Sequence, residues 1–558
     1  MKCTFHYFIL FLFTSNIVFG QGVSEAQQTQ IDALFADFDN SPTVAYGIIY
    51  NDEIISKFFG QSSRDSKQPE QFRLGGIAMH FTAYAILSLV ENKQIALTDQ
   101  VSPYLSEEVS LKMEGITVHD LLTHAHGLPE YWSLKQLQGK TAYDTFQPSD
   151  AAAIFKQPLD PLMPQGQEVS FSGTGAYLLA RIVEKVSGKS FAQYTHDQLF
   201  APLKMQHTYF CDTNTSRNQN IVSYLNKGDY YEPQIVQHND SGAAGLIATM
   251  EDLLIWFKHL QEKESTLHQQ LDQSIKYNAT TISETPNGQI TFGQQFTYEL
   301  RGVQKIWDYG SIGGFASSVF RFPEQDLSIV ILSKNGLTYN GFLGMHTADI
   351  LLADVYEEEE SPLEQEAVVE VNTIPLTQSI KEAFVGHYFN NDRYLLREIK
   401  VIDDTLRYHN SDYNSTFNLL PINEQELLVK THLGDHKIMR TPTGIDFLID
   451  GESSRLEKLA SDQMVSPLPD SFMGSYHNEG LQLQLSIVKE SDQLFLLDDE
   501  TERFVLQVVG QQRFVTKSNR YKYIKLRMEG DTPAVYVSSD GYKNIPFEQI
   551  NCSTIDRI

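Results

Sequence analysis

Few side chains of this 558-residue chain have both the type and the spacing needed for covalent chemistry. A serine becomes a nucleophile when a base lies beside it, and a Ser-x-x-Lys pair on a helix is one such arrangement because residues three apart share a face. That spacing occurs once, at Ser486–Lys489. The residues around it alternate as in a strand, where positions three apart face opposite sides, so we interpret the pair as a coincidence.

The other candidates for catalysis are isolated serine, tyrosine and histidine residues. A Ser172–Tyr309 pair or a Ser172–His pair would be required to supply a nucleophile with its base. His124 lies in the segment LLTHAHGL, where we interpret the histidine as part of the scaffold. Asp308 precedes Tyr309, and we interpret it as a hydrogen-bonded carboxylate at the surface or rim. The complete set of candidates is Ser170, Ser172, Tyr309, His80, His124 and His126.

Hydrophobic periodicity predicts the elements that would position these residues. Strand-like segments occur at both ends of the first 356 residues, and helix-like segments lie between them. This order predicts an α+β domain in which N- and C-terminal segments complete one antiparallel sheet. The predicted elements are a hairpin over 46–59 with its turn at Asn51-Asp52, helices over 81–90, 175–186 and 250–260, and strands over 319–322 and 327–332; Thr249 is the expected N-cap of the third helix.

The composition excludes some partners. The chain has 71 acidic and 43 basic residues and a formal net charge of −28, whereas nucleic acids and anionic membrane surfaces attract basic patches. With 41% hydrophobic residues it has enough apolar material for several cores. No Cys or His spacing typical of a metal site occurs, and we expect neither a metal nor a cofactor.

The N-terminus indicates export. Residues 1–20 carry one lysine, a short apolar run and small residues near Gly20, which is typical of a secretory signal peptide cut before Gln21. An uncleaved anchor is the alternative, but the apolar run is short for a membrane span. We therefore predict a secreted or periplasmic protein without a membrane span. Cys211 and Cys552 remain after cleavage, and we expect two separate thiols, with a disulfide as the alternative.

A charged, proline-containing segment divides the chain. We predict an acidic linker over 357–375, followed by two β-barrel-like modules over 376–463 and 464–558. The two modules share a repeat in one register: Phe384-Val-Gly-His-Tyr388 recurs as Phe472-Met-Gly-Ser-Tyr476, and Asp404-Thr-Leu406 recurs as Asp492-Gln-Leu494.

From residue 28 to about residue 352 the chain resembles the serine β-lactamase and penicillin-binding protein superfamily, and most closely its branch of class C β-lactamases, D-aminopeptidases and esterases. The resemblance implies an α+β domain over 21–356, and the two β modules are similar to the barrel domains of D-aminopeptidase-like members. It rests on six segments in order: 72–87 (FRLGGIAMHFTAYAIL), 116–131 (ITVHDLLTHAHGLPEY), 171–191 (FSGTGAYLLARIVEKVSGKSF), 199–208 (LFAPLKMQHT), 241–257 (SGAAGLIATMEDLLIWF) and 307–335 (WDYGSIGGFASSVFRFPEQDLSIVILSKN).

The resemblance implies acyl transfer through a serine ester, but the residues for that chemistry are absent. The serine and lysine of the family's Ser-x-x-Lys motif fall on Gly76 and Met79. The family's Tyr-x-Asn motif becomes Phe171-Ser172-Gly173, and its Lys-Thr-Gly motif becomes Asp308-Tyr309-Gly310. None of these replacements can attack a carbonyl or relay a proton as the family residues do.

The two backbone N–H groups of the family's oxyanion hole do not depend on side chains, and here they belong to Gly76 and Ser311. We therefore predict a catalytically inactive protein that binds a peptide-like small ligand or a protein partner, with Ser172 and Tyr309 lining the site. The alternatives are an active serine hydrolase with relocated residues, and a structural or assembly protein that uses its tandem β modules.

Overall fold

The computed structural model describes residues 22–550 apart from internal gaps. These gaps are 62–68, 106–112, 156–160, 163–164, 167–171, 212–220, 228–229, 263–288, 294, 337–339, 357–372, 392–393, 411–414, 432–433, 450–451, 461–468, 480, 492, 499–501, 511, 517–520, 531 and 540–541. The predicted signal peptide, Ser170, Phe171, Cys552 and most of the predicted linker thus lie outside the described residues.

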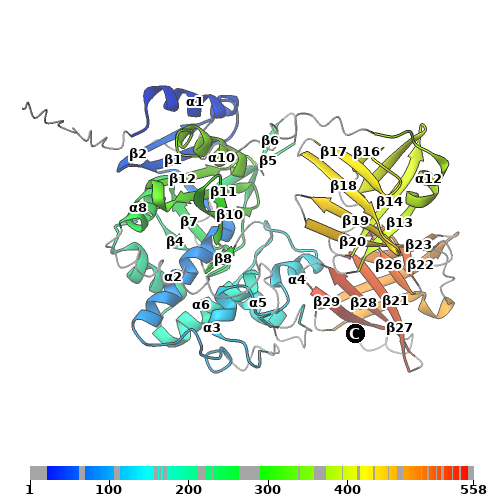
Figure 1. Ribbon diagram of the computed structural model, residues 1–558. Coiled ribbons are helices and arrows are strands. Elements are labelled where there is room, and N and C mark those ends of the chain that lie inside the picture. The colour runs from blue at the N-terminus through cyan, green and yellow to red at the C-terminus, as the bar shows by residue number, and fades with distance from the viewer. Residues whose placement is uncertain are drawn as a thin grey trace, which may run out of the picture.

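An antiparallel sheet of seven strands forms the centre of the N-terminal lobe, in the order β2-β1-β12-β11-β10-β9-β8 (Figure 1). The N-terminal hairpin β1-β2 therefore joins the C-terminal strands β10–β12 through the pairing of β1 with β12, as the α+β prediction requires. The strands are β1 (Val44–Tyr50), β2 (Glu53–Phe59), β8 (Gln289–Thr291), β9 (Gln295–Leu300), β10 (Val303–Ile312), β11 (Phe315–Phe322) and β12 (Leu327–Ser333).

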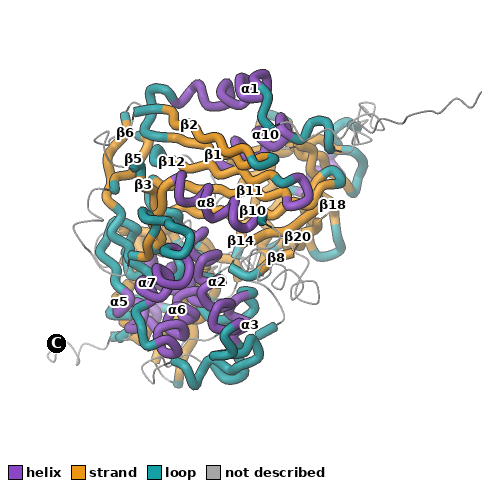
Figure 2. The backbone as a smooth tube through the Cα atoms, turned by 90° about the vertical axis from the view of Figure 1, so that its left-hand side faces the viewer, coloured by secondary structure: helices purple, strands orange, loops and turns teal. Residues whose placement is uncertain are grey.

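Helices cover both faces of this sheet (Figure 2). One face packs on α1 (Glu25–Phe35) and α10 (Asn340–Leu351), and the other packs on α2 (Ala78–Glu91) and α8 (Met250–Gln261). The remaining elements of the lobe are α3 (Val118–Leu122), α4 (Tyr131–Leu137), α5 (Pro148–Phe155), α6 (Gly173–Ser187), α7 (Phe191–Thr195), the small sheet β3-β7-β4 (Gln71–Arg73, Leu246–Thr249, Tyr209–Phe210) and the hairpin β5-β6 (Val222–Asn226, Tyr231–Ile235).

Local signals in the sequence explain several element boundaries. Asn51 and Asp52 both have positive φ (47° and 70°), which is the backbone of a tight hairpin turn and which these two residue types tolerate. Thr249 caps α8 as predicted, because its side chain accepts a hydrogen bond from the Asp252 N–H. Helix α6 begins at Gly173, two residues before the predicted start, because Ser172 is its N-cap.

In the C-terminal half, the described elements are β-strands and short helices. Strands β13–β20 close into a barrel, and β21–β29 form one nine-stranded sheet in the order β24-β23-β22-β21-β29-β28-β27-β26-β25. The barrel contains β13 (Gly386–Asn390), β14 (Leu395–Ile402), β15 (Thr405–Asn410), β16 (Ser415–Pro421), β17 (Glu426–Thr431), β18 (Gly434–Arg440), β19 (Gly444–Ile449) and β20 (Glu452–Lys458), preceded by α12 (Gln378–Phe384). The sheet contains β21 (Gly474–Asn478), β22 (Leu483–Glu490), β23 (Gln493–Asp498), β24 (Glu502–Val505), β25 (Gln507–Gly510), β26 (Arg513–Val515), β27 (Tyr523–Glu529), β28 (Thr532–Ser539) and β29 (Tyr542–Gln549).

The sequence repeat corresponds to one repeated contact. In the barrel the Tyr388 hydroxyl donates a hydrogen bond to the Phe384 carbonyl at 2.6 Å, and in the second module Tyr476 donates to Phe472 at 2.7 Å. Each bond ties the first strand of a module to the helical turn that precedes it. The repeated Phe and Tyr therefore have the same structural role, while the module boundaries remain predictions.

The second module, and not the barrel, shares its core with the N-terminal lobe. Buried side chains of β21–β29 belong to the same hydrophobic cluster as those of α2, α4 and α6, whereas the barrel interior forms a cluster of its own. In Figure 1 the module lies beside α4. The Gln138 side-chain amide donates to the Leu481 carbonyl at 3.1 Å across this contact. Within the described segments, no helix has the length and apolar character needed to cross a membrane.

Candidate functional site

The predicted nucleophile position lies where a helical turn touches an edge strand. The 3-10 turn η2 (Gly75–Ile77) leads directly into α2, and only residues 303–307 of β10 pair with β9, so its later residues lie at an edge beside η2. A Cβ placed on Gly310 would lie 1.9 Å from the Leu74 carbonyl oxygen and 2.6 Å from the Gly76 nitrogen. Only glycine permits this approach of the two backbones.

The structure brings three of the four predicted ligand-binding residues to this contact. Gly76 is partly exposed in η2, Ser311 is exposed on β10, and the Tyr309 side chain is 39% exposed beside it. A Cβ placed on Gly75 would lie 2.6 Å from the Ser311 nitrogen, so the turn and the strand are in direct contact. Met79, at the predicted lysine position, is buried in the core.

Ser172 is a helix cap in this structure. Its hydroxyl donates to Glu130 Oε2 at 2.7 Å and accepts from the Thr174 N–H at 3.2 Å, and the residue is buried. The Ser172 backbone N–H, not the hydroxyl, contacts His124 Nδ1 at 3.3 Å. The geometry therefore gives the hydroxyl an acidic partner and not an imidazole base.

Gly173 lies where the resemblance places an asparagine, and neighbouring side chains fill the adjacent space. A Cβ on Gly173 would lie 2.8 Å from Tyr131 Cε1 and 3.2 Å from Glu130 Oε1. Burial raises the pKa of Glu130, and hydrogen bonds from Ser172 and from nearby backbone amides oppose that rise. The sequence did not single out Glu130, although it stands in the motif segment that ends with Tyr131.

Asp308 is not a surface carboxylate, and the prediction of a rim position was wrong. The residue is 4% exposed, and neither side-chain oxygen accepts a hydrogen bond within the described part of the chain. Burial raises the pKa of Asp308 well above its usual range, and the nearby Tyr309 backbone N–H and the attraction of Arg321 oppose that rise. Strand alternation explains the position, because Asp308 shares the inward face of β10 with Ile306, Gly310 and Ile312.

The candidate histidines are scaffold residues. His80 accepts a hydrogen bond from Trp256 Nε1 at 2.9 Å, and His126 Nδ1 accepts from the Leu128 N–H at 2.9 Å. His124 is buried with φ of 57°. Burial lowers the pKa of His124 to about 4 and that of His126 to about 3, so both imidazoles are neutral at neutral pH.

His126 provides a test of this burial. Its folded pKa is below its unfolded value of 6.5, so it contributes stability above pH 6.5 that is lost as the pH falls. We expect the stability difference between the wild type and His126→Asn to shrink by about 2 kcal/mol from pH 7 to pH 5. Urea unfolding of both proteins at each pH measures it, and a constant difference would contradict the burial.

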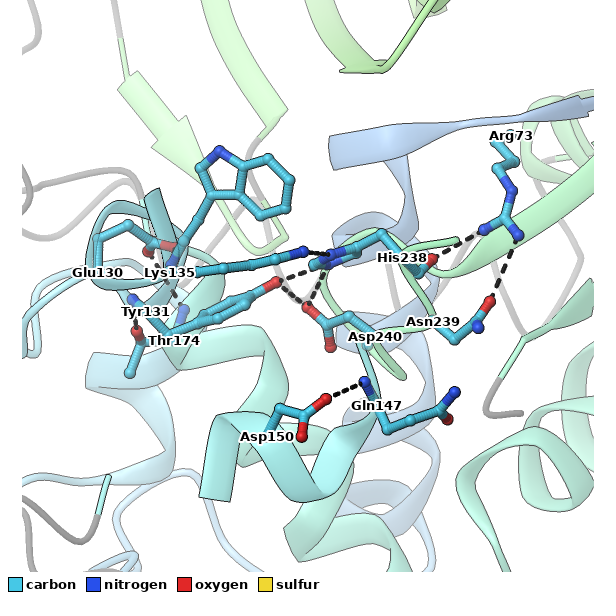
Figure 3. Close-up of polar contacts among 12 residues, drawn as sticks. Arg73, Glu130, Tyr131, Lys135, Gln147, Asp150, Thr174, His238, Asn239 and Asp240 are labelled. Carbon is cyan, nitrogen blue, oxygen red and sulfur yellow. Dashed lines mark hydrogen bonds and ion pairs between the residues drawn. The ribbon is translucent and has the colours of Figure 1, made fainter. Parts of the chain in front are cut away.

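A second group of polar residues, which the sequence did not reveal, lies beside Tyr131 (Figure 3). Lys135 Nζ donates to His238 Nδ1 at 3.1 Å, and His238 Nε2 lies 3.3 Å from the Tyr131 hydroxyl. Tyr131 donates in turn to Asp240 Oδ2. Because the lysine donates to Nδ1, the proton of the neutral imidazole lies on Nε2, toward the tyrosine.

The four residues of this hydrogen-bonded group are all buried, and even the lysine is only 1% exposed; they are Lys135, His238, Tyr131 and Asp240. Burial lowers the pKa of Lys135 to about 8, and attraction by Asp144, Asp240 and Asp150 opposes that shift. Arg73 holds the backbone at His238, because its Nη1 donates a hydrogen bond to the His238 carbonyl at 2.9 Å. In the sequence, the only sign of this group is that His238 and Asp240 lie two residues apart in a polar segment. Their partners, Lys135 and Tyr131, are about a hundred positions away in the sequence.

The sheet with helices on both faces, and the edge strand against the first turn of a buried helix, define the architecture of serine β-lactamases and penicillin-binding proteins. The chain belongs to the family described as Beta-lactamase, which it matches over residues 31–353. Its relatives include the Beta-lactamase of Escherichia coli (strain K12), with 26% identity over 52% of this chain and 84% of that one.

Two further proteins extend the comparison. Protein flp of Staphylococcus aureus (strain MW2) is 25% identical over 56% of this chain, and the match spans 64% of its length. The octameric penicillin-binding protein homologue from Pyrococcus abyssi has a similar fold, with a TM-score of 0.52 and 19% identity, over 86% of this chain and 99% of that one. That likeness includes most of the C-terminal β modules.

Proposed function

We propose that this β-lactamase-related protein is exported and catalytically inactive, and that it binds a peptide-like ligand where η2 meets β10. One observation carries the proposal: the residue at the start of the buried helix, in contact with the edge strand, is Gly76 and has no side chain. Acyl transfer requires a nucleophile at the point where the substrate carbonyl is held.

The surrounding side chains support the loss of activity. Met79 cannot accept a proton, the Ser172 hydroxyl is bonded to the Glu130 carboxylate, and Asp308 is buried with a raised pKa. None of these groups can act as the base for a nucleophile at Gly76. Among the described residues of this site, these three groups therefore supply no base, and Gly76 itself supplies no nucleophile.

The backbone supports ligand binding. Gly76 and Ser311 lie at the contact between turn and strand, and backbone N–H groups in such positions bind carbonyl or carboxylate oxygens of peptides. Tyr309 adds an exposed aromatic side chain, which stacks at 5.0 Å on Trp307. These groups suit a ligand with a peptide carbonyl and an apolar or aromatic side chain.

A covalent probe tests the absence of catalysis. We expect that neither a fluorophosphonate nor fluorescent penicillin labels a serine in residues 21–356 of the full-length protein, because the nucleophile position is Gly76 and the described Ser172 hydroxyl is bonded to Glu130. The Escherichia coli β-lactamase is the positive control, and intact-protein mass spectrometry is the measurement. Stoichiometric labelling of one serine would overturn the proposal in favour of a hydrolase with relocated residues.

A binding assay tests the second half of the proposal. We expect N-acetylated dipeptides to bind the full-length protein, and Tyr309→Ala to weaken that binding about tenfold through loss of aromatic contact area. Tyr230→Ala is the matched control, since Tyr230 is 60% exposed and precedes β6, outside the proposed site. Equal effects of the two substitutions would place the ligand elsewhere.

A further inference from the structure

A cavity of about 290 Å³ lies between the helical lobe and the second β module. Its walls come from α4, from α5, from the segment between them and from the loop that joins β21 to β22. None of the residues of η2, β10 or the α6 cap lines it. It is therefore separate from the site of the proposed function, and the inference below goes beyond that function.

The polar part of the cavity wall is built around a buried cation. The Lys135 ammonium group has its hydrogen bond to His238 Nδ1 and lies over the rings of Trp132 and Phe146, at 4.7 and 4.4 Å from their centroids. Lys140 also lines the cavity, and its backbone N–H is bonded to the Lys135 carbonyl. One hydrogen bond leaves donor capacity on the ammonium group.

The acidic member of the wall is already engaged. Asp150 Oδ2 accepts a hydrogen bond from the Gln147 N–H at 2.7 Å, at the start of α5 (Figure 3). Two lysines line the cavity against this one aspartate, whereas Asp144 and Asp240, which also attract Lys135, do not line it, so the lining itself has a local excess of one positive charge. Such a local excess favours an anionic ligand.

The apolar part of the wall defines the rest of the ligand. Phe146 and Ile154 come from the helical lobe, and Leu481 comes from the second module. The Gln138 amide, bonded to the Leu481 carbonyl at 3.1 Å, holds this module against α4. The volume lies at the lower end of the range for small-molecule pockets, so the ligand has about ten non-hydrogen atoms.

We propose that this cavity binds a small organic carboxylate with a branched apolar side chain, whose carboxylate contacts Lys135 and Lys140 and whose side chain contacts Phe146, Ile154 and Leu481. The same chemistry is presented by a free branched-chain acid and by the C-terminus of a peptide that ends in an aliphatic residue. The ligand joins the second module to the helical lobe, because both contribute to its walls.

Titration calorimetry with the full-length protein tests this site. The probes are 4-methylvalerate as a free acid, N-acetyl-leucine as a peptide C-terminus, and isopentylamine as a cation of similar shape. We expect saturable one-to-one binding of one or both carboxylates, weakened by added salt, and no binding of the amine. The carboxylate that binds more tightly shows whether the natural ligand is a free acid or a peptide C-terminus.

Substitutions at exposed wall positions keep the test independent of folding. Lys140→Gln is expected to weaken carboxylate binding about tenfold through loss of a charge-assisted hydrogen bond, and Ala153→Phe to abolish it by filling the cavity. Asp150→Asn is expected to tighten binding severalfold by removing repulsion while keeping an acceptor for Gln147. Lys185→Gln, an exposed position on α6, is the matched control and leaves binding unchanged.

Three results would overturn the proposal: no saturable binding of either carboxylate, equal binding of the amine, or carboxylate binding that Ala153→Phe does not change. Thermal unfolding of each variant confirms that it is folded. Because none of these positions lies at η2 or β10, failure here leaves dipeptide binding at Tyr309 unaffected, and the two proposals are separable.

Discussion

Alanine at position 310 is expected to lower the free energy of unfolding by about 3 kcal/mol or more. The added Cβ would lie 1.9 Å from the Leu74 carbonyl oxygen and 2.6 Å from the Gly76 nitrogen, and both are backbone atoms. A side chain can rotate away from such a clash, but the turn before α2 can move only if the edge of the sheet separates from the helix. Urea unfolding of Gly310→Ala against the wild type measures the loss.

The control for this substitution is Gly341→Ala in α10. Among the described residues, its Cβ would meet only Trp307 Cζ2, at the ordinary contact distance of 3.9 Å. Alanine is favoured over glycine inside a helix by about 1 kcal/mol, so this variant is expected to be as stable as the wild type or more stable. A Gly310→Ala protein that unfolds at the same urea concentration as the wild type would show that η2 and β10 are not in direct contact.

The largest effect in the polar cluster is expected from Asp240→Ala, which should cost about 3–5 kcal/mol. Asp240 is fully buried, and its Oδ2 accepts a hydrogen bond from the Tyr131 hydroxyl. Without it the tyrosine loses its acceptor, and Lys135 loses one of the carboxylates that stabilise its charge. The pKa of Lys135 should then fall below its value of about 8.

Asp37→Ala is the matched control for that substitution. Asp37 is exposed, in a short helical turn, so its loss should change stability by less than about 0.5 kcal/mol. Guanidinium unfolding at pH 7 compares the two variants. If Asp240→Ala were as mild as Asp37→Ala, the four side chains would not form a single coupled unit.

Much of the fold was predictable because its determinants are local. The hairpin turn at Asn51-Asp52, the Thr249 cap and the strands on either side of residues 323–326 each depend on residues within about ten positions of one another. The repeat of Phe and Tyr in the two modules was also visible, because the spacing within each motif is fixed.

The residues of the candidate site were predictable only where they belong to a short sequence motif. Gly76 and Met79 follow from the order of residues in one segment, whereas the contacts of Lys135 with His238 and of Tyr131 with Asp240 join positions more than a hundred residues apart. No short-range pattern encodes such contacts. They depend on the packing of α4 against the segment that precedes β7.

The case of Asp308 differs, because the information was present in the strand. In the segment VQKIWDYGSI the residues at 306, 308, 310 and 312 share one face, and the flanking isoleucines mark that face as the inner one. An aspartate taken by residue type alone is expected at the surface, whereas the periodicity of this strand places Asp308 inside.

The shared core of the second module and the N-terminal lobe has a consequence for the way in which this chain is made. Residues such as Phe472 and Phe547 belong to the same cluster as Phe81 and Leu178, although the barrel, with its separate core, lies between them in the sequence. A ribosome therefore completes the barrel before it synthesises the second module, which supplies part of the core of the N-terminal lobe. The first half of the protein must therefore remain with part of its apolar surface uncovered until the last hundred residues have been synthesised.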